Sequence, residues 1–210
     1  MSVLVPHAFP ESEPVTAEAV AKSLGLFEVD DRLTTFIQVA RQSLEGLQGW
    51  LGRALITQTW DLYLDAFPCD ELRLPFPPFQ KVDEIVVTNS AGAETVVDPT
   101  RYRALKGEFG VIVPVGDWPR ASVGARQQGV RVRFTCGYGA PEDLAKQAAP
   151  IVQAVTLMAG RLLAASRADM ALRNRTVEGV GSTSWMNPDD VRKGITATED
   201  ALLAPFRVWS

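Results

Sequence analysis

The side chains best suited to chemistry are scarce in this sequence. It contains a single histidine, His7, and two cysteines, Cys69 and Cys136. Histidine is the commonest general base and a frequent metal ligand, but it needs partners such as a nucleophile, an acid or further ligands. His7 stands in a proline-flanked segment near the N-terminus, outside any helical or strand pattern. The usual hydrolase and metalloenzyme sites therefore cannot be assembled, and we expect no catalytic residue and no bound metal.

The two cysteines do not indicate a structural framework either. They are too few for a disulfide-rich fold or a four-cysteine zinc site. We expect two free thiols, buried or half-buried, in a reducing compartment. A disulfide between Cys69 and Cys136 is the alternative that the sequence leaves open.

The charged residues that stand out have structural interpretations. Adjacent acids occur at 30–31, 83–84 and 189–190, and two of these pairs begin predicted helices, where the helix dipole favours negative charge. Arg131 and Arg133 alternate with apolar residues, so we expect them on a solvated strand face, with contact to an acidic neighbour as the alternative. The sequence contains no glycine-rich nucleotide motif, Walker loop, G-x-S-x-G or H-E-x-x-H. It predicts a protein that is not an enzyme and has no cofactor.

Composition places the chain among ordinary globular proteins. Of its 210 residues, 46% are hydrophobic and 22% charged, which is enough to form a core and excludes a disordered protein. The formal net charge of −4 gives no support for general nucleic-acid binding. No uninterrupted apolar run reaches the roughly 18 residues of a membrane helix, and we expect neither a membrane span nor a secretory signal.

The helical patterns lie at both ends of the chain. Residues 1–14 contain three prolines and are expected to form an extended arm. Thr16 is suited to cap a short helix that ends before Gly25. Apolar residues spaced by three and four predict a helix of five to six turns over about 33–51, and a second long helix over 141–165. Pro150 either kinks that second helix or divides it in two.

Between the helices the apolar pattern changes to a period of two. Residues 56–139 contain several short runs rich in β-branched and aromatic residues, joined by short connections. Such connections favour an antiparallel sheet or a small sandwich. The predicted class is α+β: a small helical bundle (15–55 and 140–166) with an inserted antiparallel β region (56–139), and a flexible C-terminal helical arm.

The C-terminal region is the part least easily explained by a monomer. Residues 167–186 have weak periodicity and a Gly/Ser-rich stretch, and are expected to form a linker. Asn187-Pro188-Asp189-Asp190 is typical of a helix start, and the helix is expected to continue to about residue 203. This segment either folds back on its own core or docks on another protein, and a flexible linker favours docking because it provides reach. The docking residues would be Val191, Ile195, Leu202, Leu203, Phe206, Arg207, Val208 and Trp209.

This order of elements resembles a known family. The sequence is similar to the head–tail connector, or adaptor, proteins of long-tailed double-stranded DNA phages and related gene transfer agents, in the branch with a β insert between the core helices. The most specific pieces are GRALITQTW at 52–60 and Gly137-Tyr138-Gly139 before Pro141. The match covers about residues 15–165, and is carried by the stretches 30–68, 72–105 and 130–155 and by the pair Trp118-Pro119.

The resemblance implies a structural role in the particle. Family members form a ring beneath the portal, usually of twelve subunits, that extends the DNA channel and links the capsid to the stopper or tail proteins. It implies a homo-oligomer whose partners are the portal and a stopper or tail-completion protein, with DNA passing through unbound. The C-terminal segment would engage the portal. The location would be the head–tail interface of the virion, after assembly in the cytoplasm of a host bacterium.

Two alternatives remain at this point. One is a stopper or tail-completion protein of the same neck, but such chains are typically shorter and richer in β structure than a chain with two long predicted helices. The other is a hydrolase that uses acidic residues and serine. The single histidine and the lack of a nucleophile motif weigh against it.

Overall fold

The computed structural model describes residues 2–89, 91–118, 128–167, 174–177, 181–184 and 197–208. The helices are α1 (Ala17–Ser23), α2 (Arg32–Leu44), α3 (Pro141–Gln147), α4 (Ala149–Arg167) and α6 (Ala197–Leu203), with 3-10 turns η1 (Pro99–Arg101) and η2 (Ala204–Phe206). The strands are β1 (Ser2–Ala8), β2 (Gln58–Leu64), β3 (Leu72–Arg73), β4 (Phe79–Thr88), β5 (Glu94–Val96), β6 (Tyr102–Leu105), β7 (Val111–Pro114), β8 (Val130–Cys136), β9 (Asn174–Val177) and β10 (Gly181–Ser184).

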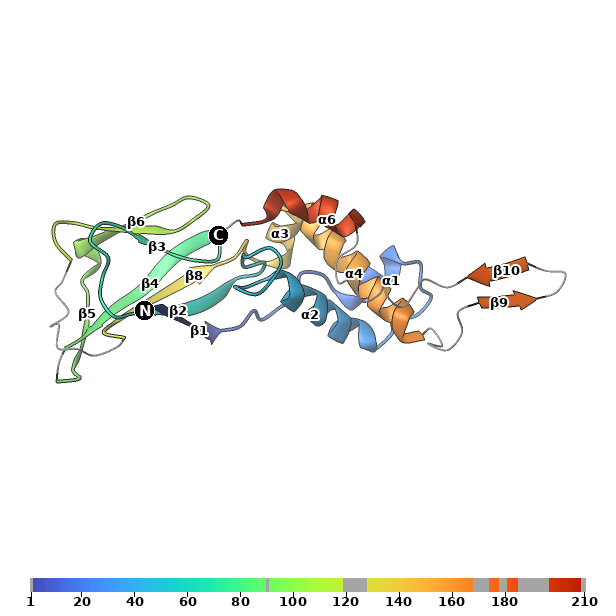
Figure 1. Cartoon of the computed structure of the whole chain (residues 1–210), viewed down its shortest axis with the longest axis horizontal. Coiled ribbons are helices and arrows are strands. Elements are labelled where there is room, and N and C mark those ends of the chain that lie inside the picture. Colours follow the sequence, from blue (N-terminus) through green and yellow to red (C-terminus); the bar gives the residue numbers. More distant parts are fainter. Residues whose placement is uncertain are drawn as a thin grey trace.

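One end of the molecule is built from two β-sheets. The larger sheet has the strand order β1-β2-β8-β4-β5 and the smaller one the order β3-β7-β6, and every neighbouring pair is antiparallel (Figure 1). Leu72, Leu74 and Ile112 of the smaller sheet and its flank share one buried cluster with Ile85 and Phe134 of the larger sheet. Of the two arrangements that the sequence left open, an antiparallel sheet or a small sandwich, the sandwich is the one observed.

Strand β8 lies at the centre of the larger sheet and shows how the sequence pattern positions its residues. Val130, Val132 and Phe134 are completely buried against the smaller sheet, while Arg131 and Arg133 project from the opposite face. Alternation with a period of two produces this division, because successive side chains in a strand point to opposite faces. The predicted assignment of the two faces is confirmed.

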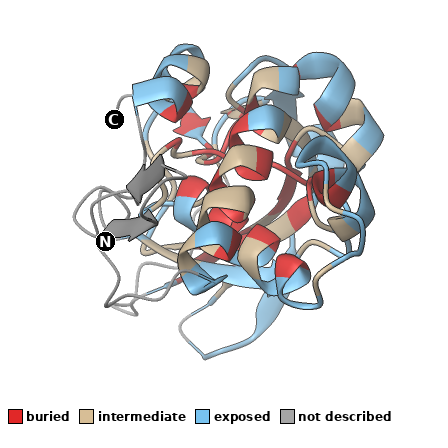
Figure 2. Cartoon of the chain, turned by 90° about the vertical axis from the view of Figure 1, so that its right-hand side faces the viewer, coloured by how far each residue is buried: buried red, intermediate tan, exposed pale blue. Residues whose placement is uncertain are grey.

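The helices form a layer next to the two sheets (Figure 1). Helix α2 packs along α4, and α1 and α6 also contact α4. Their shared core contains Leu33 and Ile37 from α2 and Ile151 and Val155 from α4. Figure 2 shows the buried residues of these helices turned toward one another and the exposed ones toward the outside. With both layers present, the predicted α+β class is confirmed.

Helix α2 is shorter than its apolar periodicity predicted. It ends at Leu44, and the chain turns back, so that the Trp50 and Leu51 N–H groups bond to the Ser43 and Leu44 carbonyls at 3.0 and 2.9 Å. Gly46 has φ +83°, a conformation that glycine adopts without the penalty other residues pay. The expected helix to residue 51 is therefore wrong.

The predicted helix over 141–165 is divided in two. Helix α3 ends at Gln147, Ala148 has the non-helical angles φ −145° and ψ 52°, and α4 begins at Ala149. Pro150 explains the break, because its ring lacks an N–H and collides with the carbonyl four residues before it in a continuous helix. Of the two outcomes that the sequence left open at Pro150, the break is the one observed.

Helix α4 has 19 residues and a mean hydropathy of 1.3 over its most apolar window, so by length and composition alone it could cross a membrane. This differs from the expectation that no stretch is long and apolar enough. In the fold, α4 is the central helix of the helical core: Ile151, Ala154, Val155 and Ala159 are completely buried. Packing against several neighbours accounts for its apolar composition.

The N-terminal segment is extended, as predicted, but it is not a free arm. Residues 2–8 form β1, an edge strand that pairs with β2 from Ser2↔Leu64 to Ala8↔Thr59. Pro6 is tolerated there because an edge strand does not need every N–H for the ladder. Glu13 then binds Arg41 of α2 at 2.7 Å. The segment connects the β-sheet to the helical layer.

The region predicted as a linker contains a β-hairpin. Strands β9 and β10 pair in antiparallel fashion, with Gly181 opposite Val177 and Ser184 opposite Asn174. The expectation of an unstructured linker over 167–186 is therefore wrong for residues 174–177 and 181–184. Turn-forming glycines at 179 and 181 suit a hairpin as well as a flexible linker, so composition alone did not separate the two.

Candidate functional site

The outer face of the larger sheet carries a cluster of charged side chains from four strands. Arg133 on β8 donates to both carboxylate oxygens of Asp61 on β2, at 2.8 and 2.9 Å. Arg131 donates to Glu84 on β4 at 3.1 Å, and His7 on β1 lies 3.8 Å from Asp61. Register explains the grouping, because Asp61 is directly opposite Arg133 across the ladder. Of the two interpretations for Arg131 and Arg133, contact with acidic neighbours is the one observed.

This cluster is built to hold a sheet together and lacks the parts of a catalytic centre. Burial raises the pKa of Asp61, but the hydrogen bonds and charge of Arg133, with Arg131 and His7 nearby, outweigh it and lower that pKa. A carboxylate held ionised in this way is a poor proton acceptor. Among the residues that the structure describes, no group of three His, Cys, Asp or Glu side chains could hold a metal ion.

Replacing Asp61 with asparagine should lower the free energy of unfolding at neutral pH by about 2 kcal/mol, because charge-assisted hydrogen bonds to Arg133 are lost. A lowered pKa in the folded state stabilises the protein above the unfolded-state pKa, near 3.9, and this contribution disappears as the pH falls. Urea unfolding of both proteins between neutral and acidic pH should thus show the difference shrinking below about pH 4. The exposed Asp70→Asn is the control, and an equal loss at every pH would contradict the argument.

The two cysteines differ sharply from each other. Cys136 on β8 is completely buried, and burial strongly raises the pKa of its thiol. Cys69 is exposed, contrary to the expectation that both would be buried or half-buried. Both are free thiols, so the alternative of a disulfide between them is not what the fold contains.

A second polar site joins the β end, the helical end and the C-terminal segment. Arg53 is almost completely buried, and its guanidinium donates to the Phe206 carbonyl at 2.5 Å, the Tyr138 hydroxyl at 2.7 Å and Glu108 at 2.8 Å. Burial raises the pKa of Tyr138, so its hydroxyl remains protonated at neutral pH. Both sequence pieces that stood out above, 52–60 and 137–139, contribute to this junction. Their role here is to position three parts of the chain.

The described part of the C-terminal segment packs on its own chain. Leu203 is completely buried in the helical core, with Leu202 and Phe206 packed beside it. The Val208 N–H donates to the Leu51 carbonyl at 2.9 Å, and the Arg207 guanidinium lies 4.6 Å from the centre of the Trp50 ring. The fold-back outcome is therefore the one observed for residues 197–208, with Leu203 buried on its own chain, and its contact with a partner stays a prediction. Val191, Ile195 and Trp209 lie outside the described residues.

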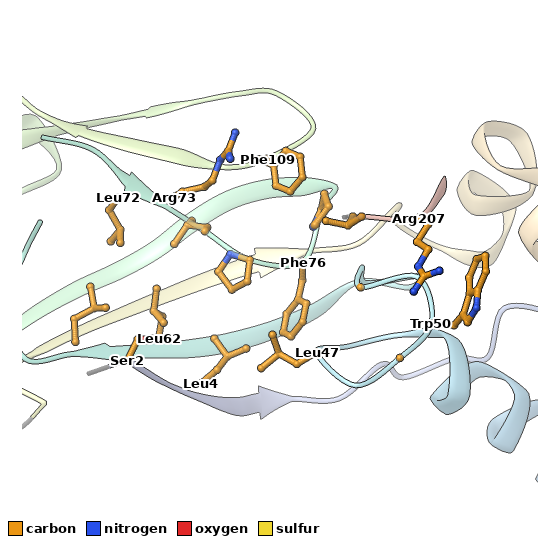
Figure 3. A pocket seen from close by; sticks show the side chains of 17 residues that line it. Ser2, Leu4, Leu47, Trp50, Leu62, Leu72, Arg73, Phe76, Phe109 and Arg207 are labelled. Carbon is orange, nitrogen blue, oxygen red and sulfur yellow. The ribbon is translucent and has the colours of Figure 1, made fainter. Parts of the chain in front are cut away.

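A groove that sequence analysis did not anticipate lies where this segment meets the sandwich (Figure 3). Its volume is about 640 Å³, within the roughly 300–1,000 Å³ range of pockets that enclose small ligands. Its walls come from β1, β2, the 47–52 loop and the proline-rich run 74–77, and include Leu4, Leu47, Leu62, Leu64, Leu72, Leu74 and Phe76. Pro75 and Pro77 were the available signal, since prolines end the short strand β3 just before this run.

Comparisons with known proteins relate the whole chain to one kind of particle. No family model and no curated protein matches the sequence. Among solved structures, a chain from the "Neck of empty GTA particle computed with C6 symmetry" is similar over 99% of this chain and 96% of its own, with 21% identity and a TM-score of 0.65. A chain from the "Virion of native gene transfer agent (GTA) particle" is similar over 99% of this chain and 96% of its own, with 20% identity and a TM-score of 0.64.

A third chain comes from the "Neck of native GTA particle computed with C12 symmetry". It is similar over 95% of both chains, with 22% identity and a TM-score of 0.60. The protein shares its fold with chains of the GTA neck. At this level of identity the likeness concerns the fold alone, but it extends over nearly the full length of both chains, so it includes the helical layer and the sandwich together.

Proposed function

We propose that this protein is a structural component of the neck of a phage-like particle, located in the virion at the junction of head and tail. The observation that carries the proposal is the full-length likeness to GTA neck chains, which share both layers of the fold. The described residues support it, because their polar clusters pair internally in the manner of structural ion pairs. Work of this kind needs no cofactor.

Within the neck we infer the role of adaptor, in a ring that lies beneath the portal and extends the DNA channel toward the stopper or tail. Similar chains come from necks computed with C6 and C12 symmetry, which supports a cyclic assembly of this chain, with twelve copies as the expected number. Contacts in such a ring are heterologous, with one face of each copy meeting a different face of the next. A net charge of −4 suits a channel through which DNA slides without being held.

The portal contact is proposed for the C-terminal region. Leu202, Phe206, Arg207 and Val208 are all half-buried, so part of each side chain remains available beside the packed Leu203. Val191, Ile195 and Trp209 complete the proposed set. Residues 197–208 pack on the chain itself. We therefore expect the portal to bind this surface either while the segment stays packed or after the segment is partly released from the helical core.

The test is reconstitution of necks on portal-bearing heads that lack this protein. Addition of the purified chain should produce a ring with twelvefold symmetry in cryo-electron micrographs, in keeping with the C12 neck of the similar chain. Arg207→Glu should reduce ring occupancy about tenfold, which corresponds to about 1.4 kcal/mol. The matched control is Arg103→Glu, a charge reversal at an exposed residue of β6.

Three outcomes separate the parts of this proposal. Normal occupancy with Arg207→Glu would remove the C-terminal portal contact while leaving the adaptor role intact. Binding only to heads that already carry another adaptor would favour a stopper or tail-completion role. Absence from every neck complex would overturn the structural function itself.

A further inference from the structure

The groove described above is open and mostly apolar. The side chains that Figure 3 shows directed into the space between the strands include Leu4, Leu47, Leu62 and Phe76. Leu47 has 72% of its side chain exposed, and a large apolar group gains nothing from contact with water. The walls of the groove are therefore suited to cover an apolar side chain from outside.

The charge in the groove has one sign. None of the described residues that line it is acidic, and two are arginines. Arg207 is already engaged with the Trp50 ring. Arg73 on β3 is exposed, and its guanidinium lies 4.8 Å from the centre of the Phe109 ring. No carboxylate of the described residues forms an ion pair with Arg73, so the groove suits an apolar side chain that is accompanied by an acid.

A second surface of the same chain has the complementary character. The loop 24–31 connects α1 to α2, and its residue Phe27 is fully exposed, with Val29 exposed beside it. Glu28 lies between these two residues and is also exposed, without an ion-pair partner among the residues that the structure describes. Every charged residue of this loop is acidic. The loop thus presents an apolar ring followed by a negative charge.

The backbone holds this loop in one shape. After α1 the Leu26 N–H donates to the Ala21 carbonyl at 2.9 Å, and the Gly25 N–H donates to the Lys22 carbonyl at 3.2 Å. Gly25 has φ +68°, and together these features form a Schellman motif. Leu26 packs against the helical core, while Phe27, the next residue, projects outward. A projecting ring on a fixed loop loses little conformational freedom when it binds.

The loop is held away from the groove of its own chain. Leu24 packs so closely on α4 that a Cβ added to Gly160 would lie 2.8 Å from its Cδ2 atom. Gly160 lies about 16 Å along the helix axis from the start of α4 at Ala149. Figure 1 shows α1 on the side of the helical layer away from the two sheets of the sandwich. A groove that receives Phe27 therefore belongs to another copy.

We propose that the loop around Phe27 of one copy docks in the groove of the next copy. Its ring lies against Leu47 and Phe76, and such a ring buries about 150–250 Å². The adjacent Glu28 carboxylate lies beside Arg73, where a charge-assisted hydrogen bond fixes the orientation. Loop and groove are different surfaces of one chain, so the contact is heterologous and repeats from copy to copy. The inference deepens the proposed function, and rests on it for the closed ring.

The test traps this contact covalently in the free full-length protein. A contact of this size is weak in isolation, since stable interfaces bury about 1,200–2,000 Å². One form of the chain carries the photoreactive residue p-benzoylphenylalanine in place of Phe27, and it is mixed at high concentration with chains labelled with a heavy nitrogen isotope. After irradiation, mass spectrometry should find cross-links from position 27 to labelled groove peptides. The same residue in place of Val39, an exposed apolar residue of α2, is the control and should give about tenfold fewer.

Changes in the labelled chain test the geometry. Leu47→Asp should reduce the cross-link about tenfold, whereas Leu105→Asp, at an exposed leucine of β6 outside the groove, should leave it unchanged. Arg73→Glu should also reduce it, because two acids then face each other. Glu28→Arg in the photoreactive chain should restore it, because the two charges are opposite again. Equal melting temperatures verify that the variants fold.

Four results would overturn the proposal. Cross-links no more abundant than those from position 39 would mean that the loop does not dock. Cross-links confined to unlabelled groove peptides would mean that the loop reaches its own groove. Cross-links to labelled peptides outside the groove would mean that the loop docks elsewhere. Failure of Glu28→Arg to restore the cross-link would remove the pairing with Arg73, and with it the proposed orientation.

These readouts need neither portal nor heads, so they are independent of the neck assignment. A ring that forms on heads while the free protein gives no such cross-link would overturn this contact and keep the proposed function. A cross-link from position 27 to the groove without any ring on heads would keep the contact and overturn the proposed function.

Discussion

Replacing Gly137 with alanine is expected to lower the free energy of unfolding by on the order of 4 kcal/mol. Gly137 follows β8 and has φ +110°, a conformation that side-chain-bearing residues rarely adopt. A Cβ added there would lie 2.3 Å from the Ile56 carbonyl oxygen and 2.9 Å from the Thr57 nitrogen. Both neighbours are backbone atoms of the two residues just before β2, so neither can rotate away. The cost therefore combines backbone strain with a steric clash.

The measurement is urea unfolding followed by circular dichroism. Gly116→Ala is the matched control, because Gly116 also has a positive φ, +81°, but no atom within 4 Å of the added Cβ. It should cost only about 1–2 kcal/mol of conformational strain. If the two variants lose equal stability, the close approach of Gly137 to Ile56 does not exist in the folded protein.

The second large effect is expected from Glu199→Ala. Glu199 on α6 has 3% of its side chain exposed and lies 3.1 Å from the Arg161 guanidinium on α4. Removing the carboxylate breaks a largely buried ion pair by deleting one partner, which typically costs about 3–5 kcal/mol. The C-terminal segment would then be held less firmly against α4. We expect lower stability by urea unfolding and faster proteolysis within residues 197–208.

The exposed neighbour Asp200 provides the control for this prediction. Asp200→Ala changes the charge of the same helix by the same amount, and should alter stability by less than about 0.5 kcal/mol, as is usual for surface substitutions. An unchanged melting temperature in Glu199→Ala would mean that α6 is not docked on α4 in solution. The C-terminal segment would then return to the free docking arm that the sequence favoured.

The sequence determined those features that depend on nearby residues. Alternation along β8 identified both of its faces, and Thr16 was correctly identified as a helix cap, since its hydroxyl accepts the Ala19 N–H at 3.2 Å. Pro150 marked the position of the α3–α4 break. Each of these signals acts through steric or hydrogen-bonding effects within a few residues, so the sequence contains all the information that they need.

Local pattern failed where distant partners compete for the same residues. The apolar period continues beyond Leu44, but α2 ends there because the Glu45 carboxylate is turned inward and bonded to Arg41, the Leu55 N–H and the Gln58 amide. That arrangement satisfies buried polar groups that a longer helix would leave unpaired. The apolar periodicity near residue 45 carries no information about Leu55 and Gln58, which lie 10 and 13 positions further along the chain.

The C-terminal segment is another feature that contacts between distant parts of the chain decide. The sequence identified Leu203, Phe206 and Val208 as apolar and near the chain end, which suited a segment that another protein covers. Only the tertiary structure supplied the alternative cover, in the form of the helical core around Leu203 and the Leu51 carbonyl that binds Val208. Apolar side chains are buried wherever the most area is removed from water, and the sequence does not state which surface that is.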